Sequence, residues 1–400
     1  MSTASGVDDP RFEVVLEKSG RVLEVSEYSL TQDFTGSTDS FSFTYYSDKA
    51  SNLKGLELQP VTIRIDDRVQ LIGRIDATIR GENGATCVKC EGRDYRSDLV
   101  ECNVDPRHVL KDGMALQDAI LFLFGPCGIT GVQTPGERVS ARTGKTVNIG
   151  LHALTSAEVK DFKPEAGRGL YEVGAELLAR FGLTIQSAIS RDMIVVQPPT
   201  YDAGTFGRIA RNAGSGTSNV ITSATARRDY SSFATSVLFT GKQGGAAEVG
   251  GAKGTKTTWS MSDVLSVYPD EIQRILSDAI VPGYSNPDAP TSGSDGKLYR
   301  LLYFCDKQGK TSQQNSNAMM RAISDRLKET LVYECEIRGH VNQVTGYNWT
   351  TDVVADIDDD MVDVHEPMWC RSAVLSNSRK AGPKTRLTFI RPSTYQIYYE

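Results

Sequence analysis

The chain has 400 residues, of which 39% are apolar and 24% are charged, a composition typical of folded globular proteins rather than disordered ones. Its 44 basic and 50 acidic residues give a net charge of −6, so the basic footprint of a protein that grips duplex DNA is not visible. The length exceeds what one hydrophobic core usually organises, and roughly two to four domains are expected.

The cysteines and the most apolar segment bear on the compartment. Seven cysteines are an odd number and predict reduced thiols rather than a disulfide framework. Met1–Pro10 carries two acids and no apolar run, so a secretory signal is not expected. Met114–Phe124 has eleven residues, fewer than the roughly 20 that a membrane span needs. We therefore expect a protein made in a cytoplasm, with no membrane binding by this chain.

Residues 11–105 have the pattern of antiparallel strands. Ser19-Gly20 and Asp66-Asp67 are typical of hairpin turns, and apolar and polar residues alternate between them, as in half-buried strands. The expected strands are Arg11–Val25 with its turn, Phe41–Tyr45, Val61–Ile65, Val69–Ile79 and Thr86–Gly92. This part is predicted to be a first tube-like β domain.

Residues 106–215 change to helical periodicity and predict an α+β domain. Asp112 is expected to cap a helix that ends at Phe124, before Gly125-Pro126. A second helix is expected over Gly169–Phe181, because its apolar residues recur at helical spacing before Gly182. The Gly- and Thr-rich segment Thr130–Gly150 is predicted to be irregular.

Residues 216–400 are predicted to form a second tube-like β domain with an inserted helical segment at about 259–330. Leu331, Tyr333, Cys335 and Ile337 should share the buried face of one strand. Gly241–Thr258 and Pro282–Gly296 are expected to be mobile because they bury little apolar surface. The remaining expected elements are helices at Pro269–Ile280 and Gln313–Lys328 and a final hairpin with arms at Trp369–Ser376 and Thr385–Arg391. The predicted fold class is thus mainly β with α+β insertions: two tube-like antiparallel β-barrel domains plus a smaller α+β domain.

An internal similarity supports either of two interpretations. At an offset of 196 residues, Asp33–Thr44 aligns without gaps with Asp229–Thr240, and four of the twelve positions are identical. Two amphipathic strands that follow turns can resemble each other by chance. Alternatively, one β domain is used twice in the chain.

Several near-motifs lack a part that their chemistry requires. Gly144-Lys145-Thr146 would need a glycine at position 139 and a helix directly after it to hold a phosphate, but that position is Val139 and a strand is expected next. Gly214–Asn219 lacks the third glycine of a dinucleotide fingerprint and is typical of a domain junction. No catalytic residue and no cofactor are therefore predicted.

Metal ligands are also incomplete. Cys87 and Cys90 have CxxC spacing without a second pair, although Cys102 and His108 keep a zinc site open as an alternative. Residues 356–367 begin like a calcium loop but lack its glycine and its final acid, so a solvated acidic turn is expected, with a low-affinity cation as an alternative. We predict no metal site.

The acidic segment Asp352–Asp363 is the most charged part of the chain. Six carboxylates lie within twelve residues, at Asp352, Asp356, Asp358, Asp359, Asp360 and Asp363. Strand alternation predicts that they face solvent, either as an outer turn without a role or as a deliberately negative surface.

The β segments resemble a known family. Val61–Asp67 with Gly73–Asp76, followed by Glu91–Cys102 (EGRDYRSDLVEC), is similar to the N-terminal domain of Mu-type baseplate hub proteins of contractile phage tails. Later segments match in order: Phe181–Ile185, Arg228–Phe233, Thr240–Gln243, Arg321–Arg338 and Leu387–Tyr395. The residues after Gly346–Trp349 depart from the family pattern, and three loops are longer than usual.

The resemblance implies a structural role without cofactors or enzymatic activity. It implies a homotrimer whose ring joins a sixfold tail tube to a threefold central spike, with DNA only passing through its channel. If the acidic segment Asp352–Asp363 approaches that channel, its field would keep the DNA phosphates from adsorbing during passage. The implied partners are the tail tube protein or tube initiator, the central spike protein and other baseplate proteins. The implied location is the tail baseplate of the virion, after assembly in the host cytoplasm.

Other functions remain open on the sequence. The hub of a phage-derived contractile injection device would have the same pattern. A cell-wall hydrolase would require paired acids in a cleft. A carbohydrate-binding module would require an exposed aromatic platform, whereas Trp259, Trp349 and Trp369 lie in or beside expected strands.

Overall fold

The protein is described from a computed structural model. The described residues are 10–47, 49, 54–80, 87–107, 109–134, 138–139, 146–147, 149–159, 162–201, 204–211, 221–229, 231, 236–242, 254–259, 301–306, 322–323, 325–326, 328, 330–342 and 345–392. The chain forms two compact units. Unit 1 comprises Met1–Ala226, Tyr333–Phe389 and Tyr398–Glu400, and unit 2 comprises Arg227–Val332 and Ile390–Ile397.

The N-terminal part of unit 1 consists of strands, as the sequence predicts. They are β1 (Phe12–Leu16), β2 (Arg21–Val25), β3 (Glu27–Asp33), β4 (Ser40–Tyr46), β5 (Pro60–Ile65), β6 (Arg68–Ile79) and β7 (Cys87–Asp94). Both predicted hairpin turns are present, with φ of +66° at Gly20 and of 50° and 63° at Asp66 and Asp67. Positive φ at the central residues of a two-residue turn matches the twist of the strands that it connects.

The middle of unit 1 is the predicted α+β part. Its helices are α1 (Arg96–Glu101), α2 (Leu116–Phe124), the 3₁₀ helix η2 (Gly125–Cys127), α3 (Ile149–Ser156) and α4 (Leu170–Ala179). Its strands are β8 (Met114–Ala115), β9 (Gly131–Gln133), β10 (Arg138–Val139), β11 (Thr146–Val147), β12 (Glu158–Val159), β13 (Thr184–Ser187) and β14 (Met193–Gln197). Leu123, Phe124, Leu177 and Leu178 belong to its separate core. We call residues 95–200 the helical layer.

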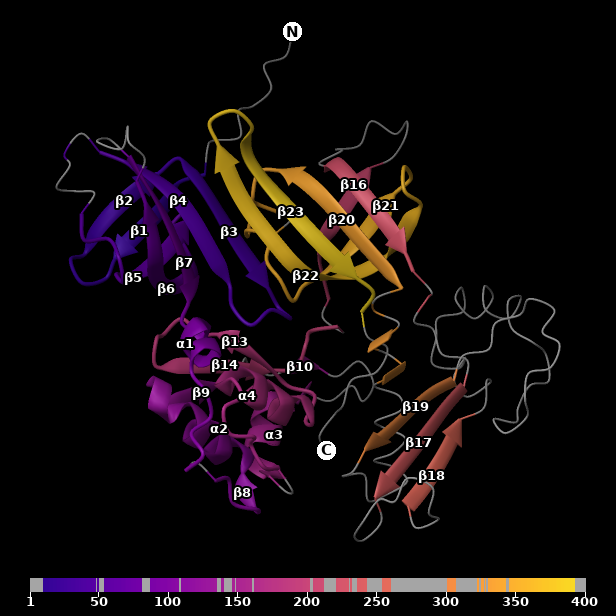
Figure 1. Ribbon diagram of the computed structural model, residues 1–400. Helices are drawn as coiled ribbons and strands as arrows, with labels where there is room; N and C mark the ends of the chain where they lie inside the picture. The colour runs from indigo at the N-terminus through magenta and orange to yellow at the C-terminus, as the bar shows by residue number, and fades with distance from the viewer. Residues whose placement is uncertain are drawn as a thin grey trace. The chain divides into compact units, whose positions relative to one another are not determined.

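Strands from the end of the chain complete the large sheet. They are β15 (Thr205–Arg211), β16 (Ile221–Arg228), β20 (Leu331–Arg338), β21 (Val354–Asp359), β22 (Val364–Ser378) and β23 (Gly382–Ile390). The sheet order is β16-β20-β23-β22-β3-β4-β7-β6-β5-β1-β2, and β21 pairs with both β22 and β15. Figure 1 shows the N-terminal strands in indigo continuing into the C-terminal strands in yellow through the β3–β22 pair.

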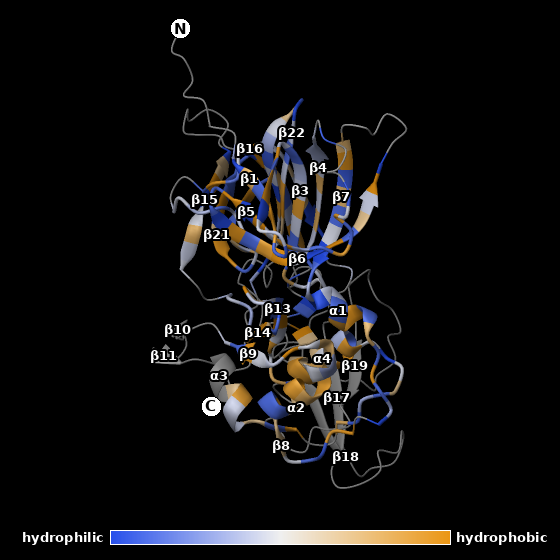
Figure 2. Ribbon diagram, turned by 90° about the vertical axis from the view of Figure 1, so that its left-hand side faces the viewer, coloured by the Kyte–Doolittle hydropathy of each residue, from blue (hydrophilic) through white to orange (hydrophobic). Residues whose placement is uncertain are grey.

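The mainly β fold class is confirmed. Among the described strands, no pairing joins the end strands β16 and β2 to close the sheet into a barrel. The division at residues 105 and 215 stays a prediction. Figure 2 shows hydrophobic and hydrophilic residues alternating along the strands of the sheet. Leu331, Tyr333, Cys335 and Ile337 are buried on one face, as predicted.

Two local predictions in the helical layer are wrong. Asp112 does not cap α2, because Met114 and Ala115 pair with β12 and the helix begins only at Leu116. The segment predicted to be irregular contains β9, β10, β11 and the start of α3. The pairings of β8 with β12 and of β9 with β14 join segments that are distant in the sequence, whereas β10 and β11 pair with each other locally.

The described helices include none long and apolar enough to span a membrane.

Unit 2 contains a three-stranded sheet with the order β18-β17-β19: β17 is Ser236–Lys242, β18 is Gly254–Trp259 and β19 is Leu301–Asp306. Both ends of Gly241–Thr258, a segment predicted to be mobile, therefore lie in strands: Gly241 and Lys242 end β17, and Gly254–Thr258 belongs to β18. Residues 243–253, Pro282–Gly296 and the helix at Pro269–Ile280 lie outside the described residues. Of the helix at Gln313–Lys328, the described positions 322, 323, 325, 326 and 328 are helical.

The internal similarity does not join equivalent strands. β4 lies between two antiparallel neighbours in the large sheet. β17 pairs antiparallel with β18 and parallel with β19 in unit 2. Different sheets and neighbours favour the first interpretation, chance similarity of two amphipathic strands.

Candidate functional site

The join between β3 and β22 makes one sheet from the two ends of the chain. The two strands pair antiparallel over six residues of each, from Ser372 opposite Asp33 to Asn377 opposite Tyr28. Since β22 is also the neighbour of β23 and β21, this ladder connects the N-terminal strands to the whole C-terminal group.

A buried group of three side chains, the Tyr28 node, lies at this join. The Tyr28 hydroxyl lies 2.8 Å from Nε2 of His340, and Nδ1 of His340 lies 2.9 Å from Oγ1 of Thr385. Thr385 donates its hydroxyl proton to the Gly339 carbonyl, so its oxygen accepts from Nδ1–H and Nε2 accepts from Tyr28. Desolvation lowers the pKa of His340 to about 4. The node is therefore uncharged at neutral pH.

One face of the joined sheet is polar and open. Ser376, Ser29, Ser42 and Glu91 lie directly opposite one another across β22, β3, β4 and β7. Directly opposite residues project from the same face of a sheet. We call this surface the open face. Because all four side chains are only partly buried, the row is accessible across the join.

The charges in the middle of the open face are paired with one another. Nε of Arg93 lies 2.7 Å from Asp76, and Nε of Arg74 lies 3.2 Å from the same carboxylate. Arg93 also pairs with Glu101. These groups border a hollow of about 380 Å³ lined by Ser29, Thr31, Ser40, Phe41, Ser42, Asp76, Ala77, Glu91, Gly92 and Arg93. The polar groups that line the hollow are thus hydroxyls and paired ions, beside Phe41 and Ala77.

A β-bulge shapes this hollow. The register of β6 and β7 shifts between Ile75 and Ala77, which adds Asp76 to one strand. A Cβ atom at Gly92 would lie 2.1 Å from the Arg74 carbonyl oxygen, so only glycine allows this approach. The close approach of the two strands therefore explains why the GRD segment of the sequence has glycine at position 92.

A buried ionic group, the Arg96 node, fastens the sheet to the helical layer. Nε of Arg96 lies 2.7 Å from Asp94, and another guanidinium nitrogen lies 2.9 Å from Asp39. The side chains of Arg96 and Asp94 are 1% and 0% exposed. Arg96 also donates to the Ile185 carbonyl at 3.2 Å, which anchors β13.

The two carboxylates of this node differ in environment. Asp94 also accepts a hydrogen bond from the Ser187 hydroxyl, and its Oδ2 accepts from the backbone N–H of Asp39. Desolvation raises the pKa of Asp39 to about 6, although the nearby Arg96 opposes the shift. Asp39 is consequently protonated over part of the mildly acidic range.

The acidic segment is not uniformly exposed, which corrects the prediction for two of its residues. Asp359 is fully buried, forms two 3.0 Å hydrogen bonds with Arg211 and accepts one from Tyr333 at 2.8 Å. Asp352 accepts from the Thr200 backbone N–H at 2.6 Å and from the Trp369 indole at 3.0 Å. Their partners lie on other strands or in the helical layer, so strand alternation alone could not identify them.

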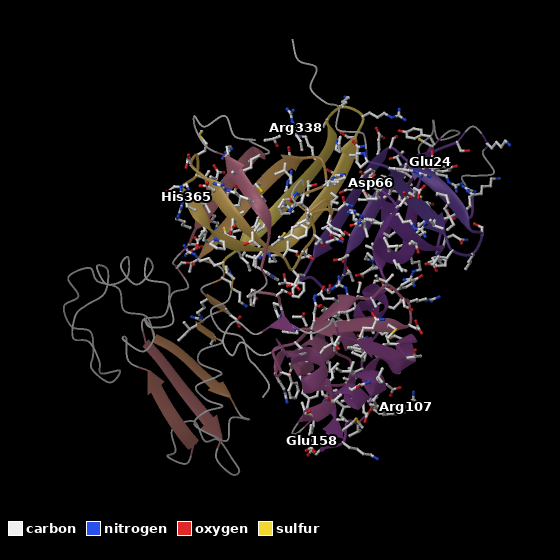
Figure 3. The ribbon with its side chains drawn as sticks, turned by 180° about the vertical axis from the view of Figure 1, so that it is seen from behind. Glu24, Asp66, Arg107, Glu158, Arg338 and His365 are labelled. Carbon is white, nitrogen blue, oxygen red and sulfur yellow. The ribbon has the colours of Figure 1, made fainter. Side chains whose placement is uncertain are left out.

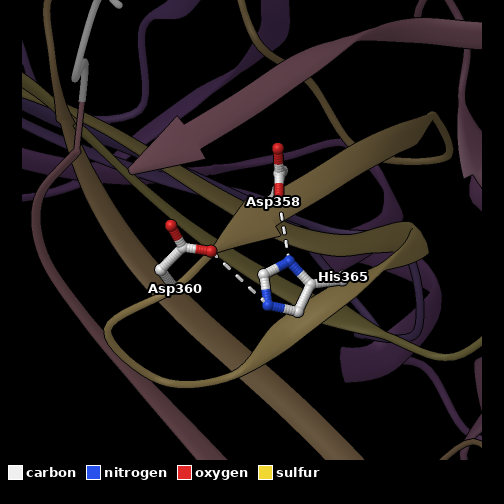
Figure 4. Close-up of side chains that lie close together, drawn as sticks. All are labelled: Asp358, Asp360 and His365. Atoms are coloured by element: carbon white, nitrogen blue, oxygen red, sulfur yellow. Dashed lines mark hydrogen bonds and ion pairs between the residues drawn. The ribbon is translucent and has the colours of Figure 1, made fainter. Parts of the chain in front are cut away.

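Three of the remaining acids, Asp358, Asp360 and Asp363, lie around His365 at the β21–β22 turn, on the C-terminal strands (Figure 3). Figure 4 shows Asp358 at Nδ1 of His365, 2.7 Å away, and Asp360 at Nε2, 3.7 Å away. Asp358 also pairs with Arg208. The hydrogen bond with Asp358 raises the pKa of His365. Because the acids lie at opposite ring nitrogens, the present arrangement suits a protonated imidazole better than a shared metal ion.

The structure places the other candidate residues apart. Cys87 is partly exposed whereas Cys90 is buried in β7, and His108 lies outside the described residues. Thr146 begins β11 and α3 follows two residues after that strand, so the expected strand is present but a helix follows it. Trp349 and Trp369 are buried, so neither forms an exposed platform.

Neither a family model nor a curated protein sequence matches the chain. Solved structures do match its fold. A tail protein from Neisseria meningitidis has a TM-score of 0.70 at 17% identity, covering 98% of this chain and 100% of that one. The 43 kDa tail protein of prophage MuSo2 from Shewanella oneidensis has a TM-score of 0.66 at 17% identity, covering 96% and 99%. A prophage tail protein from Listeria monocytogenes has a TM-score of 0.54 at 9% identity, covering 94% of each. The chain thus has the fold of phage tail proteins over nearly its whole length.

Proposed function

We propose that the chain is a non-catalytic structural subunit of a contractile phage tail, the baseplate hub. In this proposal three copies form a ring that joins the sixfold tail tube to the threefold central spike and lets DNA pass. The observation that carries the proposal is the continuous sheet made from both ends of the chain, with its polar open face. The fold shared with phage tail proteins supports it along the full length.

The sheet suits a ring because it holds two strand groups in one chain. The N-terminal group contains β1 to β7, and the C-terminal group contains β20 to β23. Three copies would place six such groups around one axis, the number that a sixfold tube needs above them. Closed assembly would also cover β2 and β16, the two ends of the described sheet, where another strand could otherwise pair.

The open face suits the surface of a passage. A strand of DNA binds proteins mainly through cations that neutralise its phosphates. Arg74 and Arg93 are already neutralised by acids, and the neighbouring side chains are short and hydroxylated. Such a face would let a polyanion slide without holding it.

The proposed partners follow from the ring. The tail tube protein or tube initiator would contact one rim, the central spike protein the other, and further baseplate proteins the outer surface. DNA would be a transient passenger. The proposed location is the tail baseplate of the virion.

Sedimentation equilibrium over a wide concentration range tests the assembly. We expect a species with the mass of three 43.7 kDa chains. A single-chain mass at the highest concentration and at low salt would contradict the hub, because the chain would then not assemble into a trimeric ring by itself. A double mutant of the edge, Val22→Lys with Glu24→Lys, should weaken the trimer, whereas Arg107→Glu in the helical layer serves as the matched control.

A further inference from the structure

Two cysteines lie beside one carbonyl oxygen at the end of α1. The Asp98 carbonyl oxygen accepts the backbone N–H of Cys102 at 3.2 Å and the thiol of Cys127 at 3.8 Å. Both residues are free cysteines and partly exposed. The shared contact therefore brings the two residues together although 25 positions separate them in the sequence.

The surroundings hold the pair in place and leave one side accessible. Leu99, Leu123 and Phe124 are fully buried and fix α1 against α2 and η2. Cys127 lines a pocket of about 390 Å³, together with Tyr95, Asp98, Leu99, Gly128, Ile129, Arg191 and Asp192. A pocket of this volume admits a small reagent beside the two residues, and Cys102 is itself partly exposed to it.

We propose that Cys102 and Cys127 are a redox modification site, free as thiols in a reducing cytoplasm and joined as an intramolecular disulfide once the protein meets a small disulfide such as oxidised glutathione. The Cys102 thiolate attacks one reagent sulfur, which forms a mixed disulfide and releases one glutathione thiolate. The Cys127 thiolate then attacks the Cys102 sulfur and releases the second glutathione. The cysteines lose two protons and two electrons in total, and the reagent is reduced to two thiols.

The same surroundings set the rate of the second step. Burial, then the hydrogen bond with Cys102, raises the pKa of Cys127 to about 12. Only the thiolate is nucleophilic, so closure of the disulfide is slow at neutral pH and accelerates as the pH rises. The pair is thus slow to oxidise while a cell is intact and reacts during long exposure outside it.

The bond would tie the end of α1 to the turn that follows α2. Closing this loop restricts the unfolded chain and so stabilises the helical layer. Arg96, which fastens the helical layer to the sheet, lies on the same helix α1. A tail particle would therefore fold with free thiols and become covalently reinforced after release. The bond forms within a single chain and does not depend on ring assembly.

Peptide mapping of the purified protein tests the site. The reduced protein is incubated with excess oxidised glutathione at pH 8.5 until thiol loss stops, then alkylated and digested without reductant. We expect a peptide pair linked through Cys102 and Cys127, and a fall from seven to five thiols in denaturant. The bond should be absent in Cys102→Ser and Cys127→Ser and present in Cys87→Ser, a partly exposed cysteine of β7.

A second measurement distinguishes a structural bond from incidental oxidation. The oxidised protein should show an unfolding temperature for the helical layer that is higher by roughly 5 °C, reversed by dithiothreitol and absent in Cys102→Ser. Alkylation of both cysteines after oxidation would overturn the proposal. Glutathione that stays on Cys102, or linkage to any other cysteine, would overturn it equally.

Discussion

The two junctions of unit 1 are built from opposite chemistry. At the join of the sheet, the uncharged Tyr28 node supplements a continuous backbone ladder. Between the sheet and the helical layer, where the Arg96 node lies, buried ions carry the connection. At the join, the β3–β22 ladder already forms the hydrogen bonds of the backbone. At the helical layer, loop and strand ends meet instead, so side chains must form the hydrogen bonds there. The difference predicts distinct sensitivities to mutation and opposite responses to pH.

The largest effect is expected at the Arg96 node. Arg96→Met leaves Asp94 buried without its cation and should destabilise the protein by about 3–5 kcal/mol. Denaturant unfolding measures this loss. Adding Asp94→Asn should recover part of it, because the uncompensated charge disappears. Arg107→Ala, on an exposed side chain of the helical layer, is the control and should change the free energy of unfolding little. Equal losses in Arg96→Met and Arg107→Ala would contradict the assignment.

The Tyr28 node should respond less strongly. His340→Leu removes the hydrogen bonds of the buried imidazole to Tyr28 and Thr385 and should cost about 2 kcal/mol. The folded pKa of about 4 lies below the ordinary value of 6.5, so the unfolded state binds more protons between these values. His340 therefore contributes stability above pH 6.5 that is lost as the pH falls toward 4. Unfolding of the variant across this window should lack that loss relative to the unchanged protein.

Asp39 should give the opposite pH response. Its folded pKa of about 6 lies above 3.8, so the folded state binds more protons in between. Its contribution is present below pH 3.8 and is lost as the pH rises through 6. Asp39→Asn should remove this loss and leave stability near pH 7 equal or higher. A lower stability of Asp39→Asn at pH 7 would show that the pairing with Arg96 outweighs desolvation.

The smallest effect is expected at the exposed turn. Asp358→Asn removes the hydrogen bond that raises the pKa of His365, so an NMR titration should show that pKa moving down. The unfolding midpoint should stay unchanged, because exposed ion pairs contribute little to stability. A large change in the midpoint with no change in the titration would reverse this interpretation.

Local signals predicted the strands well. The turns at Ser19-Gly20 and Asp66-Asp67 and the alternation at Leu331–Ile337 depend on neighbouring residues, and the structure confirms them. β3 was missed although Tyr28 and Leu30 alternate with polar residues, because it follows β2 after a single residue. Nothing local distinguishes Asp359 from the exposed acids beside it.

The candidate site was largely beyond sequence reasoning. Asp359 is buried because Arg211 reaches it from β15, and Arg96 is buried because β13 lies across from β7. Such pairings join residues that are far apart in the chain, and they decide which charges are structural. Asp94 and Arg96 lie in the segment Glu91–Cys102, which the sequence analysis singled out for its resemblance, but their burial is not visible in that pattern.

Cryo-electron microscopy of the assembled chain tests the proposed hub most directly. We expect a threefold ring with a central opening lined by the open face, so that Ser29, Ser42, Glu91 and Ser376 of each copy border the channel. A ring whose open face is covered by a neighbouring copy, or an assembly without a central opening, would contradict the hub.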